Sequence, residues 1–481
     1  MEMPDRTSLQ STDRKVFLIM QRATFRLVSA VGSGSPPRRG LFVAALAIVL
    51  GACGGGNGSV DSASGPGVAS VGSSSANLCE GLVTDKLAHA MTDVAKPAVG
   101  GSFVDPQFGT TIRRISDAAA KGFEFIKPMY STIQAWNADE TRLILLRPGG
   151  WHELYDGKTY QYLRTLDDIS PADDEQVYWD TTDPQVLYYA NIVERRLYRY
   201  NVETRAKTML RDFSTPPTSC GSGVDLTGGT DPMYMSWQGR KIGLTCGGKI
   251  FSYDIDAGVV GTVLTKTTGE GGAQNAPQAA PSGTRYFLND SDRIGTVRDA
   301  NMNELLTLDV INSGEHGSLG RLASGHDIFY SVQFDSGPVA ARAGKDNSGT
   351  LVAHDMWDGS WRVIIGQSQG YPYPPSGTHI SAVAHKNPGW VAVSVIGDLS
   401  GGKLGQGVLE SEIILADTNP GGAVCRVAHH RSCGGNCGTI GYFAEPHVVI
   451  SPSGTRMIFG SDWGGGKTAD TYVVELPAYR P

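Results

Sequence analysis

Long apolar runs are scarce in this 481-residue sequence. The apolar run Leu41–Leu50 is only about half as long as the roughly 20 residues that a membrane-spanning helix needs. Arg38 and Arg39 precede this run, and Gly51-Ala52-Cys53 follows it. That order of basic, apolar and small residues is typical of an export signal and not of a transmembrane anchor. We therefore expect residues 1–52 to be a signal peptide.

Helical periodicity, nucleotide-binding loops and an excess of basic charge are also missing. No long segment from Phe103 to Leu476 places apolar residues at helical spacing, which argues against a helical domain. The glycine runs lack the context of a phosphate-binding loop, and no serine lies in the strand-to-helix turn of a hydrolase nucleophile elbow. With 41 Lys and Arg against 48 Asp and Glu, the net charge is −7. Binding to nucleic acid is therefore not expected.

The N-terminal signal resembles that of bacterial lipoproteins because it ends in Leu-Gly-Ala-Cys. This resemblance implies that Cys53 becomes the lipidated first residue; the alternative is an ordinary cleaved signal that leaves Cys53 free. Residues 53–102 begin with a Gly/Ser-rich stretch that cannot bury a core, so we expect a tether and lead-in there. The protein is then an exported lipoprotein of the outer membrane, cell surface or periplasm, held on the membrane by its lipid alone.

A strand–turn–strand unit recurs along residues 103–481. Short strand-like runs alternate with Gly, Pro, Asp and Asn, and the turns that begin at Pro281 and Pro452 read PSGT, a pattern typical of all-β chains. The second strand of the unit has seven copies: RLILLR, QVLYYA, KIGLT, RYFLND, DIFYSV, GWVAVSV and RMIFGS. Their spacing of roughly 40 to 65 residues is that of propeller blades. The sequence therefore predicts an all-β fold, a seven-bladed β-propeller.

The last unit is one strand short of a complete blade. It ends at TYVVEL with three strands, whereas the run GTTIRRIS (Gly109–Ser116) stands alone at the other end of the domain. Pairing the two would close the ring and remove an exposed edge, so we expect N- and C-terminal strands to close one blade. The units resemble TolB-type (PD40) propeller repeats, whose core reads SPDGxxIxFxS, and this resemblance implies the same fold.

Three histidines occupy nearly one column of the last three units. His316, His379 and His447 each stand 14 or 15 residues before a serine in the second strand of their unit. The first strand of each blade lines the central channel, so these histidines should gather on one side of its mouth. Neutral imidazoles there can bind Mn²⁺ or Zn²⁺, or one can act as a general base while the others bind substrate. The remaining alternative is three solvated histidines that bond to neighbouring loops.

The runs GTTIRRISDA and KPMYSTIQAWNADETRLIL resemble the start of oligogalacturonate lyases. These are seven-bladed propellers that cleave uronic-acid oligosaccharides by β-elimination, with a histidine-held metal that binds the uronate carboxylate and a histidine that removes the C5 proton. The resemblance implies His316, His379 and His447 as site residues. All three are candidate ligands of a divalent cation (Mn²⁺, Zn²⁺ or Ca²⁺), and His316 and His379 are also catalytic candidates. The family has two histidines one residue apart in the last blade. Here Glu445-Pro446 precedes His447, and Glu445 is the candidate oxygen ligand.

Four further residues are candidates for the same mouth. Arg321, five residues after His316, is either a catalytic carboxylate clamp or a solvated turn arginine. Tyr130 and Gln134 enter the first unit and either bind substrate or serve as ordinary strand and turn residues. Trp463 follows the second strand of the last unit, where it either stacks on a sugar ring or packs within the blade.

Six cysteines follow Cys53, and an even number in an exported chain favours disulfides. Cys220 and Cys246 flank the first two strands of the third unit and are expected to pair. Mixed Cys and His in CRVAHHRSCGGNCG can suggest zinc, but the spacing matches no standard zinc finger, so disulfides are expected there too. Cys79 must pair with one of the cysteines of that run, which are Cys425, Cys433 and Cys437.

These features predict a membrane-anchored, polysaccharide-active propeller, specifically a lyase that cleaves uronic-acid-containing glycans by β-elimination. Its site would lie at the channel mouth beside the fifth to seventh units. The alternative is a non-catalytic TolB-like propeller that binds a protein or a cell-envelope glycan. The expected partner is thus a carbohydrate or a protein, with no nucleic acid, and the expected state is a monomer.

Overall fold

The computed structural model describes residues 77–191, 193–222, 226, 235–265, 276–289, 295–308, 316–333, 350–371, 378–397, 403–434, 437 and 439–480. The predicted signal peptide, Cys53 and the Gly/Ser-rich part of the tether lie outside the described residues. Within the described part of the chain, no helix is long and apolar enough to cross a membrane.

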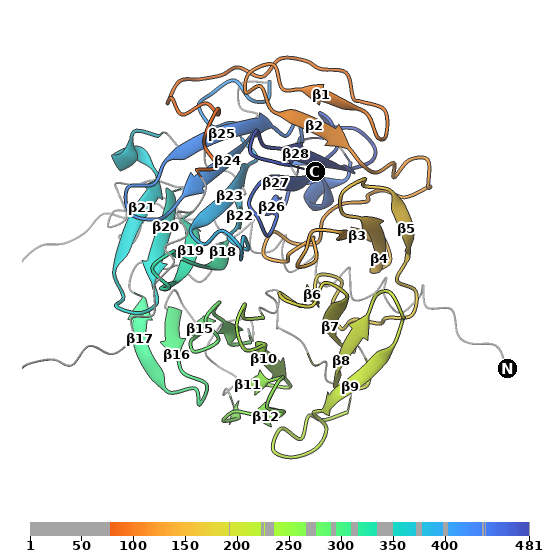
Figure 1. The fold of residues 1–481 in the computed structure, drawn as a ribbon, viewed down its shortest axis with the longest axis vertical. Helices are drawn as coiled ribbons and strands as arrows, with labels where there is room; N and C mark the ends of the chain where they lie inside the picture. Colours follow the sequence, from red (N-terminus) through yellow and green to blue (C-terminus); the bar gives the residue numbers. More distant parts are fainter. Residues whose placement is uncertain are drawn as a thin grey trace, which may run out of the picture. The chain divides into compact units, whose positions relative to one another are not determined.

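Seven antiparallel sheets stand around a common axis, like the blades of a propeller (Figure 1). We call the region along this axis, which the innermost strands face, the channel. The described residues contain no α-helix, only short 3-10 turns that include Gly441–Ala444. The predicted all-β, seven-bladed fold is therefore confirmed. The blades follow the chain order of the repeats, because each strand–turn–strand unit hydrogen-bonds with itself before the chain moves to the next blade.

The first four blades contain strands β3 to β17. Blade 1 has β3 (Arg142–Arg147), β4 (Trp151–Asp156) and β5 (Tyr162–Thr165); blade 2 has β6 (Val177–Trp179), β7 (Val186–Ala190), β8 (Arg196–Asn201) and β9 (Lys207–Asp212). Blade 3 has β10 (Lys241–Cys246), β11 (Lys249–Asp254), β12 (Val259–Val260) and β13 (Leu264–Thr265); blade 4 has β14 (Gln278–Ala279), β15 (Tyr286–Asn289), β16 (Gly295–Arg298) and β17 (Glu304–Leu308).

The last three blades contain the remaining strands, including the first two of the chain. Blade 5 has β18 (Gly317–Arg321), β19 (Asp327–Gln333), β20 (Thr350–Asp355) and β21 (Trp361–Ile365); blade 6 has β22 (Thr378–Ser381), β23 (Trp390–Val395), β24 (Glu412–Asp417) and β25 (Val424–His429). Blade 7 has β26 (Val449–Ile450), β27 (Arg456–Ser461), β28 (Asp470–Glu475), β2 (Thr111–Arg114) and β1 (Ser102–Val104).

Blade 7 joins the two ends of the domain. Strand β2 pairs antiparallel with β28, with Ile112 opposite Val474, and β1 adds to the outer edge. Both Ile112 and Val474 are fully buried, so the pairing buries apolar surface as well as satisfying backbone groups. The predicted closure by N- and C-terminal strands is confirmed.

The innermost part of blade 1 is interrupted. Lys127 bridges to Leu146 and Trp136 bridges to Leu143, so residues 128–135 leave the ladder between these two points. We call residues 128–135 the channel segment. It extends toward blades 6 and 7, because Gln134 Nε2 donates hydrogen bonds to backbone oxygens in both of these blades.

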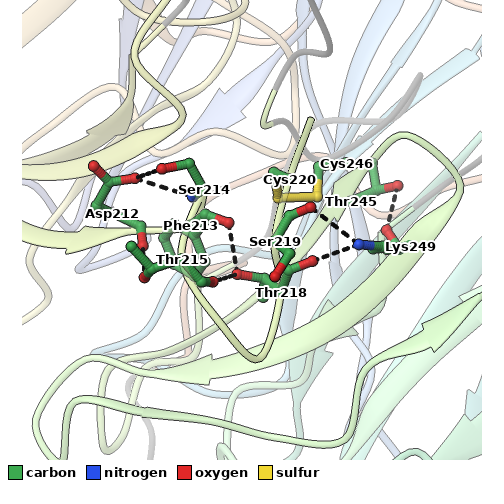
Figure 2. Close-up of a disulfide and its surroundings, with 10 residues drawn as sticks. All are labelled: Asp212, Phe213, Ser214, Thr215, Thr218, Ser219, Cys220, Thr245, Cys246 and Lys249. Atoms are coloured by element: carbon green, nitrogen blue, oxygen red, sulfur yellow. Dashed lines mark hydrogen bonds between the residues drawn. A yellow bond between two sulfur atoms is a disulfide. The ribbon is translucent and has the colours of Figure 1, made fainter. Parts of the chain in front are cut away.

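Three disulfides fasten the fold. Cys220 bonds to Cys246, as predicted, and Figure 2 shows Lys249 beside this disulfide, where its Nζ donates to Thr218 O at 2.7 Å and Ser219 O at 3.1 Å. The partners that the sequence left open are also defined: Cys79 bonds to Cys425, and Cys433 bonds to Cys437. The Cys79–Cys425 disulfide ties the lead-in to β25 of blade 6.

Buried neutral histidines should make the fold sensitive to acid. Burial lowers the pKa of His354 to about 3 and of His430 to about 4, from an ordinary 6.5. As the pH falls below about 6.5, the unfolded chain therefore binds protons that the folded chain does not. The free energy of unfolding should decrease between about pH 6.5 and pH 4, by up to about 1.4 kcal/mol per pH unit for each ring. Urea unfolding across this range measures how the free energy of unfolding changes with pH. In His354→Gln this pH dependence should be smaller by the contribution of one proton. The same pH dependence in both proteins would contradict the prediction.

Candidate functional site

The three histidines of the predicted column meet at one mouth of the channel. His316 immediately precedes β18, His379 lies in β22, and His447 precedes β26. The ring centroids of His316 and His379 are 4.4 Å apart, and those of His379 and His447 are 4.1 Å apart. Each histidine begins the inner strand of its blade, and these strands start at the same mouth. Residues at the same position of consecutive repeat units therefore lie side by side in the folded protein. We call the cluster of His316, His379 and His447 the histidine mouth.

Glu445 completes a potential ligand set at this mouth. Its Oε2 lies 3.6 Å from His379 Nε2 and 4.0 Å from His447 Nε2. One ligand atom from each of these three residues can be chosen so that all lie within 4.8 Å of one another. Imidazole nitrogens and a carboxylate oxygen suit Mn²⁺ and Zn²⁺.

The ring nitrogens of His379 and His447 are suited to bind a cation because few of them have another partner. Among the described residues, both ring nitrogens of His379 and Nε2 of His447 are buried without a hydrogen-bond partner. Buried polar atoms are rarely left in this state. Burial lowers the pKa of both histidines well below the ordinary value, and the nearby Lys127 and His316 lower it further. The rings are therefore neutral, which is the form that coordinates a metal.

Tyr130, which the channel segment of blade 1 carries, lies against all three histidines. Its ring centroid lies 5.5 Å from those of His379 and His447 and 6.5 Å from that of His316. The channel segment places it there, because this segment leaves the blade 1 ladder and enters the channel. Tyr442 adds a second aromatic wall, 4.7 Å from His447.

Lys127 is a member of the histidine mouth that the sequence analysis missed. Its Nζ lies 3.1 Å from His447 Nδ1, donates to Met129 O at 3.1 Å, and lies 3.8 Å from a carboxylate oxygen of Glu175. Burial lowers the pKa of Lys127, although Glu175 and Glu445 act in the opposite direction. A lysine inside the apolar run FEFIKPMY was the available signal, since a fully buried lysine is rare.

The acidic residues at the mouth have pKa values above their ordinary range. Burial raises the pKa of Glu445 to about 8 and of Glu175 to about 7, and in both cases Lys127 lowers it. Burial also raises the pKa of Asp173 to about 6. Titratable groups with strongly shifted pKa values gather at functional sites more often than elsewhere.

No protein-family model and no curated protein matches the sequence. Two solved structures superpose on the chain, each with a TM-score of 0.54 and 12% identity over 81% of this chain and 99% of its own: an oligogalacturonate lyase in complex with manganese, and the oligogalacturonate lyase of Vibrio parahaemolyticus. The chain has the oligogalacturonate lyase fold. At this identity the likeness establishes the fold alone.

Arg321 does not join the histidine mouth. It lies at the far end of β18 from His316, roughly 16 Å away along an extended strand, and its Nε donates to Gly325 O at 2.9 Å within its own hairpin. The proposed carboxylate clamp is therefore corrected to a turn arginine. Because Arg321 follows His316 by five residues along an extended strand, it lies toward the other end of the channel and not beside His316 at the same mouth.

Trp463, one of the predicted substrate-binding residues, packs between blade 7 and the lead-in. Trp463 stacks on Tyr472 with ring centroids 4.8 Å apart, meets Phe103 edge-on at 5.6 Å, and donates from Nε1 to Val94 O. It thus joins blade 7 to the lead-in, and none of its contacts among the described residues involves the histidines.

Gln134 fastens the channel segment to blades 6 and 7. Its Nε2 donates to Val383 O at 3.1 Å and to Ile450 O at 2.9 Å, and its Oε1 accepts from Trp136 N at 3.1 Å. Both amide hydrogens are therefore used. Gln134 is thus a structural link between blade 1 and blades 6 and 7, and its contact with a substrate stays a prediction.

Proposed function

We propose that the protein is a metal-dependent lyase that cleaves uronic-acid-containing glycans by β-elimination at the histidine mouth. The observation that carries the proposal is the convergence of His379, Glu445 and His447, whose candidate ligand atoms lie within 4.8 Å of one another. Three buried ring nitrogens without hydrogen-bond partners among the described residues are costly in a purely structural cluster, and a ligand would remove that cost.

The two imidazoles and the carboxylate would hold a divalent cation such as Mn²⁺. A cation bound there would attach the uronate carboxylate and make the neighbouring C5 proton more acidic. A cation bound there would in turn favour the ionised form of Glu445, because a nearby positive charge lowers the pKa of a carboxyl.

His316 is the candidate base of this reaction. It is the partly exposed member of the histidine mouth and stacks on His379, so substrate can reach it. It would take the C5 proton, and the electron pair of the broken C5–H bond would form the C4=C5 double bond as the C4–O4 bond breaks. Tyr130, whose ring contacts all three histidines, is the candidate donor of the proton that the leaving O4 takes.

Ultraviolet absorbance from unsaturated uronates tests the proposal. Purified protein is incubated with polygalacturonate, oligogalacturonates and other anionic polysaccharides, with added Mn²⁺, with Ca²⁺ and after chelation. We expect absorbance to rise with at least one substrate, to depend on the cation, and to be lost in His316→Ala. Silence across the panel under all cation conditions would overturn the proposal and favour the non-catalytic, glycan- or protein-binding propeller.

A further inference from the structure

An acidic side chain of blade 2 lies at the same mouth as the three histidines. Glu175 stands two residues before β6, the innermost strand of its blade, just as His447 stands two residues before β26. Residues at the same position of the repeat face the same end of the channel. The Glu175 carboxylate lies 3.8 Å from Lys127 Nζ, which in turn lies 3.1 Å from His447 Nδ1. Glu175 is therefore one side chain away from the candidate metal ligands.

Two further carboxyl groups accompany Glu175 on its loop. Asp173 Oδ1 accepts a hydrogen bond from the backbone N–H of Glu175 at 2.8 Å. Burial raises the pKa of Glu175, and the charges of Asp173 and Asp174 raise it further. The Glu175 side chain is 21% exposed, so a ligand at the mouth can contact it. The blade 2 side of the mouth thus presents negative charge, whereas blades 5 to 7 present the histidines.

The cation nearest to these acidic groups is already engaged. Burial raises the pKa of Glu175 and of Glu445, and Lys127 is the one cationic side chain among the described residues that lowers either of them. Lys127 is fully buried, and its Nζ contacts Met129 O, His447 and Glu175. A sugar carboxylate beside Glu175 would therefore lose its hydration without gaining an opposite charge.

The histidine side of the mouth gives independent evidence of a ligand. Both ring nitrogens of His379 and Nε2 of His447 are buried without a hydrogen-bond partner in the described part of the chain. Buried polar atoms are rarely left in this state, and these atoms lie next to Glu445 and not next to the blade 2 carboxyls. The mouth therefore has two different sides: one that suits a cation with a bound uronate, and one that suits a positive group.

We propose that the substrate is a glycan in which the uronate is linked to a sugar that carries a free amino group. The uronate carboxylate would bind at the cation held by His379, Glu445 and His447, and the ammonium group of the neighbouring sugar would pair with Glu175. A positive charge beside Glu175 favours its ionised form, which strengthens the pairing. A chain made of uronates alone would place a second carboxylate there instead. The inference rests on the proposed function, because it takes the cation site as the place of the uronate.

Calorimetric titration with three tetrasaccharides tests this substrate class. The first is a hyaluronan tetrasaccharide, in which uronates alternate with N-acetylated amino sugars; the second is the same compound after N-deacetylation; the third is tetragalacturonate. The protein is His316→Ala with Mn²⁺, so that bound sugars are not cleaved. We expect the N-deacetylated compound to bind at least about fivefold more tightly than its acetylated form, which corresponds to the upper range of an exposed ion pair. Tetragalacturonate should bind most weakly.

Glu175→Gln separates the effect of charge from that of shape. Glutamine has nearly the same size as glutamate, so a preference that arises from the smaller amino group would persist, whereas one that arises from charge would disappear. Glu203→Gln is the matched control, because Glu203 follows β8 of the same blade, is 40% exposed and pairs with Arg142. Both variants should still be stabilised by Mn²⁺ in a melting experiment, which shows that they are folded.

The outcomes separate this inference from the proposed lyase activity. A preference for the N-deacetylated compound that Glu175→Gln removes and Glu203→Gln keeps supports the inference, whatever the lyase assay shows. Equal binding of the acetylated and N-deacetylated compounds overturns it, as do tightest binding of tetragalacturonate, a preference that persists in Glu175→Gln, and absence of binding by all three. Cleavage of polygalacturonate together with any of these results would leave the proposed function standing and remove only the substrate class.

Discussion

His447→Asn should abolish the stabilisation of the protein by Mn²⁺ and its lyase activity together. His447 supplies one of the candidate ligand atoms at the histidine mouth, and its removal should lower metal affinity by more than the roughly 10- to 100-fold seen when outer-shell partners are lost. At a metal concentration about 100 times the dissociation constant, wild-type protein should gain about 2.7 kcal/mol of stability, while the variant should gain almost none.

Asparagine is the appropriate replacement because of the backbone. His447 has φ 42°, in the left-handed region that asparagine tolerates better than alanine. The control is His326→Asn, since His326 lies outside the mouth and bonds to Asp355 at 2.7 Å. Melting temperature with and without Mn²⁺, together with elemental analysis of untagged protein, gives readouts independent of activity. Equal Mn²⁺ stabilisation in wild type and His447→Asn would refute the assigned ligand set.

Asp470→Ala should have the largest effect on stability, because Asp470 fastens the closing blade. Its fully buried carboxylate lies 3.0 Å from Arg114 Nη2 and 2.5 Å from Lys96 Nζ, and accepts from Ala118 N at 2.7 Å. Removing one partner of a buried ion pair costs about 3–5 kcal/mol; because Arg114 keeps Asp117 at 3.1 Å and Lys96 is partly exposed, we expect a loss near the lower end of that range. Because Arg114 belongs to β2, the loss should first release the N-terminal strands from β28.

Urea unfolding and limited proteolysis check this expectation. Asp183→Ala is the matched control: its carboxylate is 39% exposed and pairs with Arg199, so its removal should cost no more than about 1 kcal/mol. In Asp470→Ala, protease should cut first in the lead-in and near β2. A change in unfolding free energy no larger than that of Asp183→Ala would show that the ring closure does not depend on this carboxylate.

Lys127 and Gln134 show why the sequence predicted only part of the site. Both belong to the interrupted inner strand of blade 1, where the chain leaves the ladder at Lys127 and returns at Trp136. The repeat pattern predicts the position of a residue only while the chain follows the ladder. Within the channel segment, packing against distant blades decides which side chain meets the histidines and which one bonds to Val383 and Ile450.

The sequence by itself determined the seven blades, the closure of the ring by its two ends, the Cys220–Cys246 pair and the gathering of three histidines at one mouth. These follow from strand periodicity and repeat phase, which are carried by neighbouring residues. The tertiary structure alone decided that Lys127 joins the histidines, that Arg321 faces the other end, that Trp463 packs against the lead-in and that Cys79 bonds to Cys425. Such contacts join residues far apart in the chain, and their geometry exists only after the ring has closed.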